Sequence, residues 1–411
     1  MNTASYSELP AMFQRHAPPY LAERATGDVV VSAEGASLHL ADGRTLLDAA
    51  SGGFGYGVSP VVEAVQAQLR RLPLSNRVLI SRTLAELVVE LDKLCPTPLS
   101  VSYVCNSGDE AFEGALKLAK GLNPRRNRLL VVAGSRPGSL SYGTLLAGIG
   151  AGYLDALGME VVPIRPNDSA SLAGSLDRST LAVVYEPVIR ERGLCRLEAA
   201  FLTEMRRGCD THGCLMIASE LHTGLGFAGT PLGISLTGVV PDALVLGDAL
   251  GGGQIGVGVY VTSKAINDAV YGGRNPSLHG STTGGNPASC VAATVALRHL
   301  ARERIAQRQE GLGRAFTERF ASRAANPESL IRNYQVCGGL VSVELPGPAP
   351  ADRLWRECLG AGLLLQRPRD RWLYLAPPLT VSEREWEQVL QRLQRGCERA
   401  GCEPAALREV V

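Results

Sequence analysis

The chain has 411 residues, of which 45% are hydrophobic and 20% are charged, as is typical of a soluble globular protein with a large core. Its 41 basic and 40 acidic residues nearly cancel without forming runs, which argues against nucleic acid and membrane surfaces as partners. No apolar run approaches the roughly 20 residues of a membrane helix, and the N-terminus lacks a secretion-signal pattern. We therefore expect a cytoplasmic protein whose partner is a small-molecule substrate.

Short apolar runs alternate with amphipathic segments through the middle of the chain. Ser59-Pro60 predicts the start of one helix, and Thr83 with Glu86 forms a capping-box pattern before another. Further helices are expected over 108–122 and 199–212, and strands over 101–104, 129–132, 181–185, 214–218, 243–246 and 257–261. Apolar strands that alternate with helices indicate a mainly parallel sheet covered on both faces. Sites in such sheets lie at the carboxyl ends of the strands.

Both ends of the chain depart from this alternation. The expected elements there are short strands over 28–50, one helix over 288–325, and strands over 341–344 and 372–375. Ser382 and Glu385 form the capping-box pattern of a last helix. We expect residues 1–55 to pack with a small α+β domain at 301–411, and residues 56–300 to form a large α/β domain that holds the site.

Several short motifs follow one another in a fixed order over most of the chain. They are 106–111 (Asn-Ser-Gly-Asp-Glu-Ala), Glu186-Pro187, 219–224 (Ser-Glu-Leu-His-Thr-Gly), 247–253 (Gly-Asp-Ala-Leu-Gly-Gly-Gly), 279–282 (His-Gly-Ser-Thr), Asn286-Pro287 and 377–379 (Pro-Pro-Leu). Their order and spacing resemble those of class III aminotransferases, which are fold-type I pyridoxal-phosphate enzymes. The resemblance implies an α/β, fold-type I aminotransferase-like fold, with a mainly parallel sheet in a large domain plus a small α+β domain. It also implies a dimer whose active sites lie at the subunit interface.

The residues at two central cofactor positions depart from this family. By the resemblance, Asp248 stands where the family has its Schiff-base lysine, and Ser219 stands where it has the aspartate that holds a proton on the pyridine nitrogen. A carboxylate cannot form an imine, and a serine cannot hold that proton. Both the covalent link and the electron sink of the family are therefore expected to be lost.

Three more positions depart in the same direction. In the phosphate loop, Ser107 is followed by Gly108 and then by Asp109, where the family has threonine, and a carboxylate at a helix N-terminus repels phosphate. Arg136 replaces the ring-stacking aromatic residue, and Tyr374 replaces an arginine that often grips a substrate carboxylate. By the family's geometry, none of the four lysines is expected to point into the pocket. We therefore expect no cofactor, with pyridoxal phosphate not used.

The resemblance gathers the remaining polar residues in one pocket. We expect Asp248 to act as general acid or base, with His222 and Glu220 as its partners, and Arg136 to hold an anionic group of the substrate. The expected substrate-binding residues are Arg136, Asp109, Ser107, Ser219, Glu186, Tyr374 and Thr282. Neighbouring carboxylates raise one another's pKa, which suits acid–base work. A metal held by Asp248, His222 and a glutamate is an alternative that the spacing does not support, so no metal is expected.

These observations predict a repurposed enzyme that works without pyridoxal phosphate. It would perform acid–base chemistry, such as cyclisation, condensation, elimination or hydrolysis, on a small polar amine or carboxylate metabolite in specialised biosynthesis. Two alternatives stay open. The chain is a non-catalytic subunit of a heterodimer, in which Thr282 completes the phosphate site of an active paralogue, or it is an aminotransferase-like enzyme that uses the cofactor non-covalently. The expected assembly is a homodimer or such a heterodimer.

Overall fold

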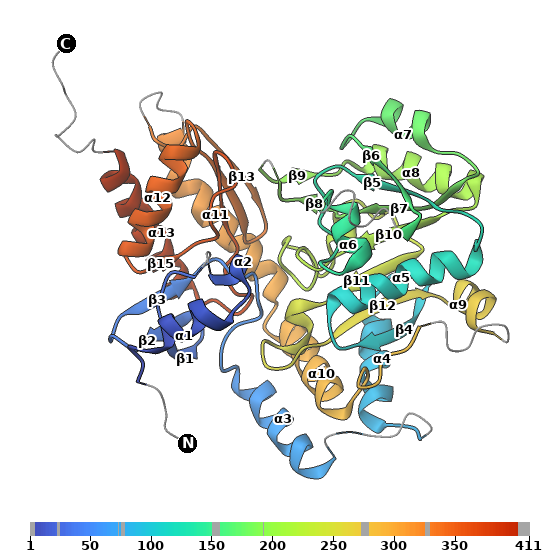
Figure 1. The fold of residues 1–411 in the computed structure, drawn as a ribbon, viewed down its shortest axis with the longest axis horizontal. Helices are drawn as coiled ribbons and strands as arrows, with labels where there is room; N and C mark the ends of the chain where they lie inside the picture. The colour runs from blue at the N-terminus through green and yellow to red at the C-terminus, as the bar shows by residue number, and fades with distance from the viewer. Residues whose placement is uncertain are drawn as a thin grey trace.

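A computed structural model describes residues 5–22, 25–72, 74, 79–149, 157–191, 193–272, 279–324 and 329–401. The centre of the chain forms one seven-stranded sheet (Figure 1). In spatial order its strands are β4 (Leu99–Cys105), β12 (Gly258–Ser263), β11 (Ala243–Leu246), β10 (Leu215–Ser219), β7 (Thr180–Tyr185), β5 (Arg128–Val132) and β6 (Glu160–Ile164). Only β12 runs antiparallel to its neighbours, so the expected mainly parallel sheet is confirmed.

Helices cover both faces of this sheet because alternate strand residues point to opposite sides. On one face, Leu129 and Val131 pack with α5 (Gly108–Leu122), near α9 (Lys264–Tyr271). On the other face, Leu130 and Val132 belong to a second core. That core also holds residues of α3 (Ser59–Arg71), α4 (Arg82–Leu94), α7 (Ser169–Ser175), α8 (Ala199–His212) and α10 (Pro287–Arg302). Double coverage explains why the strands read as continuous apolar runs.

The two ends of the chain share a second body, where the blue and red elements lie together in Figure 1. The elements are β1 (Val30–Glu34), β2 (Ser37–Leu40), β3 (Thr45–Asp48), α11 (Ile305–Ala324), β13 (Asn333–Cys337), β14 (Leu340–Glu344), α12 (Pro348–Gly360), β15 (Leu363–Leu364), β16 (Trp372–Leu375) and α13 (Glu383–Gly401). Strand β15 extends the N-terminal sheet by pairing with β3, through Leu363 opposite Leu47. Trp386 of α13 is buried in the core that these elements share. The division at residues 55 and 300 stays a prediction.

Two local expectations differ from the structure. The helix expected over 288–325 is two helices, because the chain turns at Arg304, which has φ +50° between α10 and α11. The capping box at Thr83 is not formed: α4 begins at Arg82, and Glu86 pairs with the Arg82 side chain instead. The ion pair with Arg82, one helical turn away, replaces the hydrogen bond that Glu86 would make in a capping box.

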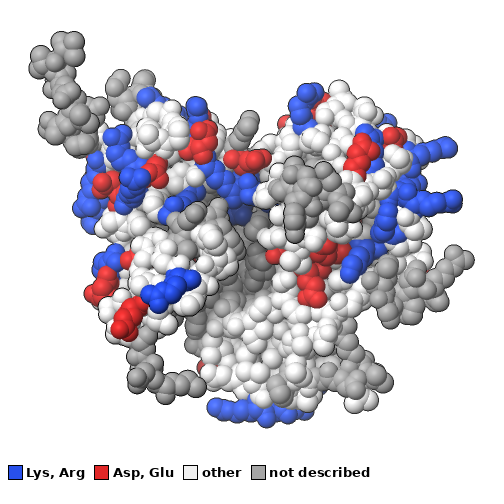
Figure 2. All heavy atoms as spheres, viewed as in Figure 1, with Lys and Arg blue, Asp and Glu red and all other residues white. Residues whose placement is uncertain are grey.

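The cap of the last helix is present. The Ser382 hydroxyl accepts from the N–H of Glu385, and the Glu385 carboxylate accepts from the N–H of Ser382 at 2.8 Å. Acidic and basic side chains intermix over the face shown in Figure 2, above a broad uncharged area around α10. Within the described ranges, none of the helices combines the length and apolar character needed to cross a membrane.

Candidate active site at the strand ends

A polar cavity of about 400 Å³ lies beside the carboxyl ends of β5, β7 and β10. Its polar walls come from Asp109, Ser139, Thr144, Arg136, Glu186, Arg190, His222, Gln366 and Arg369. Three of these side chains follow neighbouring strands, since Arg136, Glu186 and His222 come just after β5, β7 and β10. The segment between β15 and β16 supplies Gln366 and Arg369 from the other body. Residues far apart in the sequence therefore meet where a doubly covered sheet is expected to place its site.

Glu186 is the buried acid of this cavity. Its side chain is 2% exposed; Oε2 accepts the N–H of Arg136 at 2.7 Å, while Oε1 has no hydrogen-bond partner among the described residues. Burial raises the pKa of this carboxyl to about 7, against the opposing effects of the Arg136 N–H and the nearby arginine charges. A carboxyl that titrates near neutrality with one oxygen left over can donate or accept a proton.

His222 is the second titratable group on the cavity wall. Burial lowers its pKa well below the usual value, and the positive charges of Arg190, Arg369 and Arg136 add to the effect. The imidazole is therefore neutral at pH 7 and can accept a proton. The cavity thus pairs a carboxyl that holds its proton unusually well with an imidazole that is held neutral.

Glu220 lies outside the cavity lining, although it directly follows β10. Its carboxylate is 2% exposed and accepts two backbone N–H groups, from Gly233 and from Ile234, the latter at 2.7 Å. Burial raises its pKa to about 7, while those two hydrogen bonds act in the opposite direction. Both oxygens are thus engaged in fixing the loop that carries His222.

The N-terminus of α5, where the resemblance places a phosphate, is occupied by the chain's own groups. The Ser107 hydroxyl caps the helix by accepting the N–H of Glu110 at 3.1 Å. Asp109 accepts the N–H of Ser139 at 2.8 Å, and Glu110 accepts the N–H of Asn106 at 2.7 Å. Two carboxylates already satisfy the positive end of the helix dipole, so this end does not offer a phosphate cup.

Side chains of the protein also occupy the space in which the resemblance places the cofactor ring. Ser219 is buried, and its hydroxyl donates to the carbonyl of Pro137 at 3.3 Å. A Cβ on Gly108 would lie 2.3 Å from Cδ2 of Leu221 and one on Gly247 would lie 2.9 Å from the same atom, so Leu221 fills the space between the phosphate-loop and lysine positions. The residues present do not fit pyridoxal phosphate held in the family's manner.

No lysine replaces the missing amine at this cavity. All four lysines are described and none lines it. Lys93 pairs with Glu90 and Lys264 pairs with Asp268, while Lys120 donates to the Arg126 carbonyl and Lys117 is exposed. Among the described residues there is also no group of three His, Cys, Asp or Glu side chains placed to hold a metal ion.

Four other expected residues, Ser107, Ser219, Tyr374 and Thr282, do not line the cavity. Asp248 begins a short 3-10 turn directly after β11, and its side chain lies outside the described part of the structure. Tyr374 is buried, and its hydroxyl accepts the N–H of Gly193 at 3.0 Å. Thr282 is exposed and lines a separate hollow of about 380 Å³.

Arg190 and Arg369 line the cavity but were missed from the sequence. Arg190 carried a usable signal, because it lies four residues after Glu186 in the segment that leaves the strand end. Arg369 carried none, because it reaches the cavity only through the packing of the second body against the sheet. Tertiary packing alone therefore completes the basic wall.

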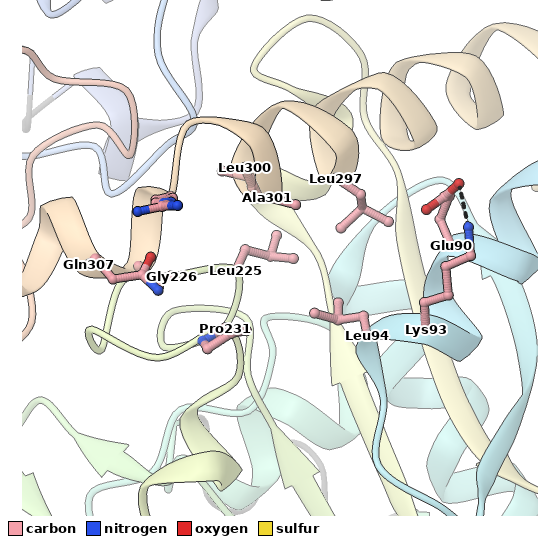
Figure 3. A pocket seen from close by; sticks show the side chains of 12 residues that line it. Glu90, Lys93, Leu94, Leu225, Gly226, Pro231, Leu297, Leu300, Ala301 and Gln307 are labelled. Carbon is pink, nitrogen blue, oxygen red and sulfur yellow. Dashed lines mark hydrogen bonds and ion pairs between the residues drawn. The ribbon is translucent and has the colours of Figure 1, made fainter.

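A larger hollow of about 570 Å³ lies elsewhere, among α4, α10 and the loop after β10 (Figure 3). Its walls are mainly apolar, with Leu94, Leu225 and Leu297 facing the space. Glu90 and Lys93, at its edge, are joined in an ion pair of 3.2 Å. This hollow gathers no unengaged acid–base group, so the strand-end cavity is the better candidate for chemistry.

Solved structures of transaminases share this fold over nearly their whole length. An acetylornithine aminotransferase from Elizabethkingia anophelis has 24% identity and a TM-score of 0.81, covering 97% of this chain and 100% of that one. A transaminase from the marine bacterium Virgibacillus has 18% identity and a TM-score of 0.86, covering 96% and 99%. An amine transaminase from an uncultivated Pseudomonas species, in its PLP-bound internal aldimine form, has 23% identity and a TM-score of 0.81, covering 94% and 97%.

The comparisons contradict one expectation and confirm another. The profile of the class III aminotransferases matches residues 21–142 and 167–396. The expectation that the chain takes no cofactor is wrong for the family to which it belongs. The matching family is a pyridoxal-phosphate family, and the Pseudomonas neighbour holds that cofactor. The expected fold-type I architecture is confirmed. With most of its length matched, this chain belongs to the class III aminotransferase family.

Proposed function

We propose that this chain is an aminotransferase-fold enzyme that transfers protons on a small polar amine or carboxylate metabolite bound in the strand-end cavity. The observation that carries the proposal is the Glu186 carboxyl at the cavity wall: burial raises its pKa to about 7, and its Oε1 has no hydrogen-bond partner in the described part of the chain. A buried polar atom without a hydrogen bond costs free energy. The unpaired Oε1 of Glu186 therefore supports a ligand as its hydrogen-bond partner.

The two titratable groups take complementary roles. Glu186, when protonated, donates its proton from Oε1 to a developing negative charge on the substrate, and when ionised it removes a proton. Neutral His222 accepts the second proton of the exchange. The arginines of the same wall hold an anionic group of the substrate and so fix its orientation. Asp248 is proposed as a further acid–base group, because it follows β11 at the same edge of the sheet.

Pyridoxal phosphate enters the proposal through family membership. The cofactor would supply an electron sink for a carbanion, but Ser219 cannot hold the proton on the pyridine nitrogen that strengthens this sink in the family. Asp248 at the lysine position excludes an imine with the protein there, so this chain would hold the cofactor without a covalent link. The proton transfers proposed for Glu186 and His222 are carried out by these side chains themselves and not by the cofactor.

Deuterium exchange tests the proton-transfer role. The protein is isolated from its own host, and native mass spectrometry identifies any small ligand that it carries. That ligand, together with a panel of amino and oxo acids, is then incubated in D₂O with and without added pyridoxal phosphate, and NMR follows exchange of carbon-bound protons. Glu186→Gln should slow the exchange by about a hundredfold or more.

The matched control for this test is Glu198→Gln, an exposed glutamate whose side chain lies away from the cavity. It should exchange substrate protons at the parent rate. A Glu186→Gln protein with the parent fold and the parent exchange rate would contradict the proposed acid–base role.

A second candidate function is that of a subunit in a heterodimer. Thr282 lines its hollow together with Leu74 and Leu79, which are 58% and 72% exposed, and the neighbouring Ile80 is 94% exposed. Exposed apolar side chains in a group favour a protein partner. By the resemblance, Thr282 would then reach the phosphate site of that partner.

Native mass spectrometry separates the two functions. A heterodimer with a lysine-containing relative, whose cofactor affinity falls with Thr282→Ala in this chain, supports the subunit role. A homodimer that carries its own ligand supports the enzyme.

A further inference from the structure

We propose that Arg136, Arg190 and Arg369 form a binding site for the phosphate monoester group of a small ligand. This inference rests on the proposed function for its link to catalysis, and it names the class of ligand that the strand-end cavity takes. None of the three arginines belongs to α5, at whose N-terminus the family places a phosphate, although Asp109 of its first turn lines the same cavity.

The three arginines converge from separate segments of the chain. Arg136 follows β5, Arg190 follows β8 (Val188–Ile189), and Arg369 precedes β16, yet all three line the same cavity. The Arg369 guanidinium donates to the backbone carbonyl of Arg190 at 3.4 Å, which fixes two of the segments together. Burial lowers the pKa of Arg369, and the charges of Arg136 and Arg190 lower it further.

Two of the three arginines, Arg136 and Arg369, form no ion pair with another described residue. Among the described residues, no carboxylate oxygen lies within 4 Å of the guanidinium of Arg136 or of Arg369. Of the nearby acids, Asp109 accepts the N–H of Ser139 and Glu186 has a pKa of about 7, while the charge of Glu191 acts on Arg369 and opposes the lowering of its pKa by burial. Like charges held together in a partly buried site favour an anionic ligand.

Arg136 and Arg369 also line an outer hollow of about 730 Å³, so they stand where the inner cavity meets the surface. The acids of the outer hollow are Glu191, Glu344 and Asp370. Arg371 lies 3.9 Å from Glu344 and 3.7 Å from Asp370, so these two acids already have a cation of their own. Arg136 and Arg369 are therefore the cations of the outer hollow that have no ion pair with another described residue.

A phosphate monoester matches the site better than a single carboxylate. It carries a charge of about −1.5 to −2 at pH 7 and offers three acceptor oxygens. Planar guanidinium groups bind such oxygens in pairs, so Arg136 and Arg369 can both bind one phosphate beside Arg190, whereas the single charge of one carboxylate would not match the two. The cavity of about 400 Å³ is of the size that holds a small metabolite.

The phosphate has two possible sources, the pyridine cofactor or a phosphorylated substrate. Calorimetry with inorganic phosphate, pyridoxamine 5′-phosphate and O-phosphoserine, each beside its unphosphorylated counterpart where one exists, separates them. Both sources predict that phosphorylation tightens binding by about tenfold or more. Preference for pyridoxamine 5′-phosphate assigns the site to the cofactor, and preference for O-phosphoserine assigns it to a substrate.

Two variants and a matched control locate the binding. Arg136→Gln and Arg369→Gln should each weaken the phosphorylated ligand by roughly tenfold to a hundredfold. Arg367→Gln should bind as the parent does, because Arg367 lies outside the cavity lining and is stacked 5.0 Å above the Trp355 ring. Binding of none of the three phosphate probes, parent affinity in both variants, or tighter binding of 2-oxoglutarate than of either phosphorylated ligand would each overturn the proposal.

The Glu186→Gln variant keeps this test separate from that of the proposed function. If the phosphate site is correct, that variant retains the affinity for the phosphorylated ligand within about threefold, because Glu186 is not one of the three cations. Loss of exchange chemistry with retained binding supports both proposals. Parent exchange rates with retained, arginine-dependent binding would refute the acid–base role alone, and parent chemistry with arginine-independent binding would refute both.

Discussion

Glu186 and Glu220 occupy equivalent places in the fold and do different things. Each directly follows a fully buried strand, β7 or β10, and each side chain is 2% exposed with a pKa raised to about 7 by burial. Both carboxylate oxygens of Glu220 accept hydrogen bonds, from the N–H groups of Gly233 and Ile234. Glu186 accepts the N–H of Arg136 with one oxygen, and the other has no hydrogen-bond partner among the described residues.

The difference shows that a raised pKa does not by itself identify an acid–base residue. Burial moves the pKa of the two carboxyls alike, yet only an oxygen without an internal partner can exchange a proton with a ligand. Glu220 is therefore expected to matter for stability, and Glu186 for chemistry and for the pH dependence of stability. Mutagenesis can test whether the two glutamates have these different roles.

The largest effect on stability is expected from Glu220→Ala. Removal of the carboxylate leaves two buried N–H groups without acceptors and frees the loop that carries His222. The free energy of unfolding should fall by about 3 kcal/mol or more. Urea denaturation measures this, with Glu198→Ala as the exposed control that should stay within about 0.5 kcal/mol of the parent. A loss below about 1 kcal/mol would mean that Glu220 is not a structural anchor.

The next effect is a pH dependence that Glu186→Gln should remove. The folded-state pKa of Glu186 is about 7 against a usual value of 4.5, so between these values the unfolded chain ionises first. The folded state then binds more protons than the unfolded state, and stability falls as pH rises from 4.5 through 7. Glutamine does not titrate, so the variant should lose this slope.

The difference should appear as a gain in stability at alkaline pH. At pH 8 the variant should be more stable than the parent, relative to their difference at pH 4, by up to about 3 kcal/mol. Urea denaturation at several pH values measures this for both proteins, and the Glu220 contribution cancels because it is common to them. Parallel stability curves for the two proteins would show that Glu186 is not held protonated.

The sequence predicted the scaffold well because the relevant signals are local. Helices α5 and α8 and strands β11 and β16 have the bounds that apolar periodicity and end signals indicated. The break at Arg304 was missed because neither glycine nor proline marks it; the turn depends on a left-handed backbone at an arginine. Tertiary packing of α10 and α11 overrides the continuous helical pattern there.

The site was predicted only in part because its chemistry depends on which atoms are left without partners. Glu186 and Glu220 look alike in the sequence, and nothing local shows that Gly233 and Ile234 return to one of them. Arg136, Glu186 and His222 were expected together, and the strand-end rule does bring them to one cavity. Arg369 required the packing of the second body.

The smallest effect is expected from Asp109→Ala, which extends the comparison to a carboxylate with an intermediate environment. Asp109 is partly exposed in the first turn of α5 and accepts one N–H, that of Ser139, at 2.8 Å. Its removal should cost about 1 kcal/mol, because water can replace the lost bond and the helix-end interaction is weak. Urea denaturation measures this, with Asp109→Asn retaining an acceptor and recovering about half of the loss. A loss in the free energy of unfolding close to that of Glu220→Ala would show that the number of hydrogen bonds accepted by a carboxylate does not set its stabilising effect. The distinction between Glu186 and Glu220 would then need another physical basis.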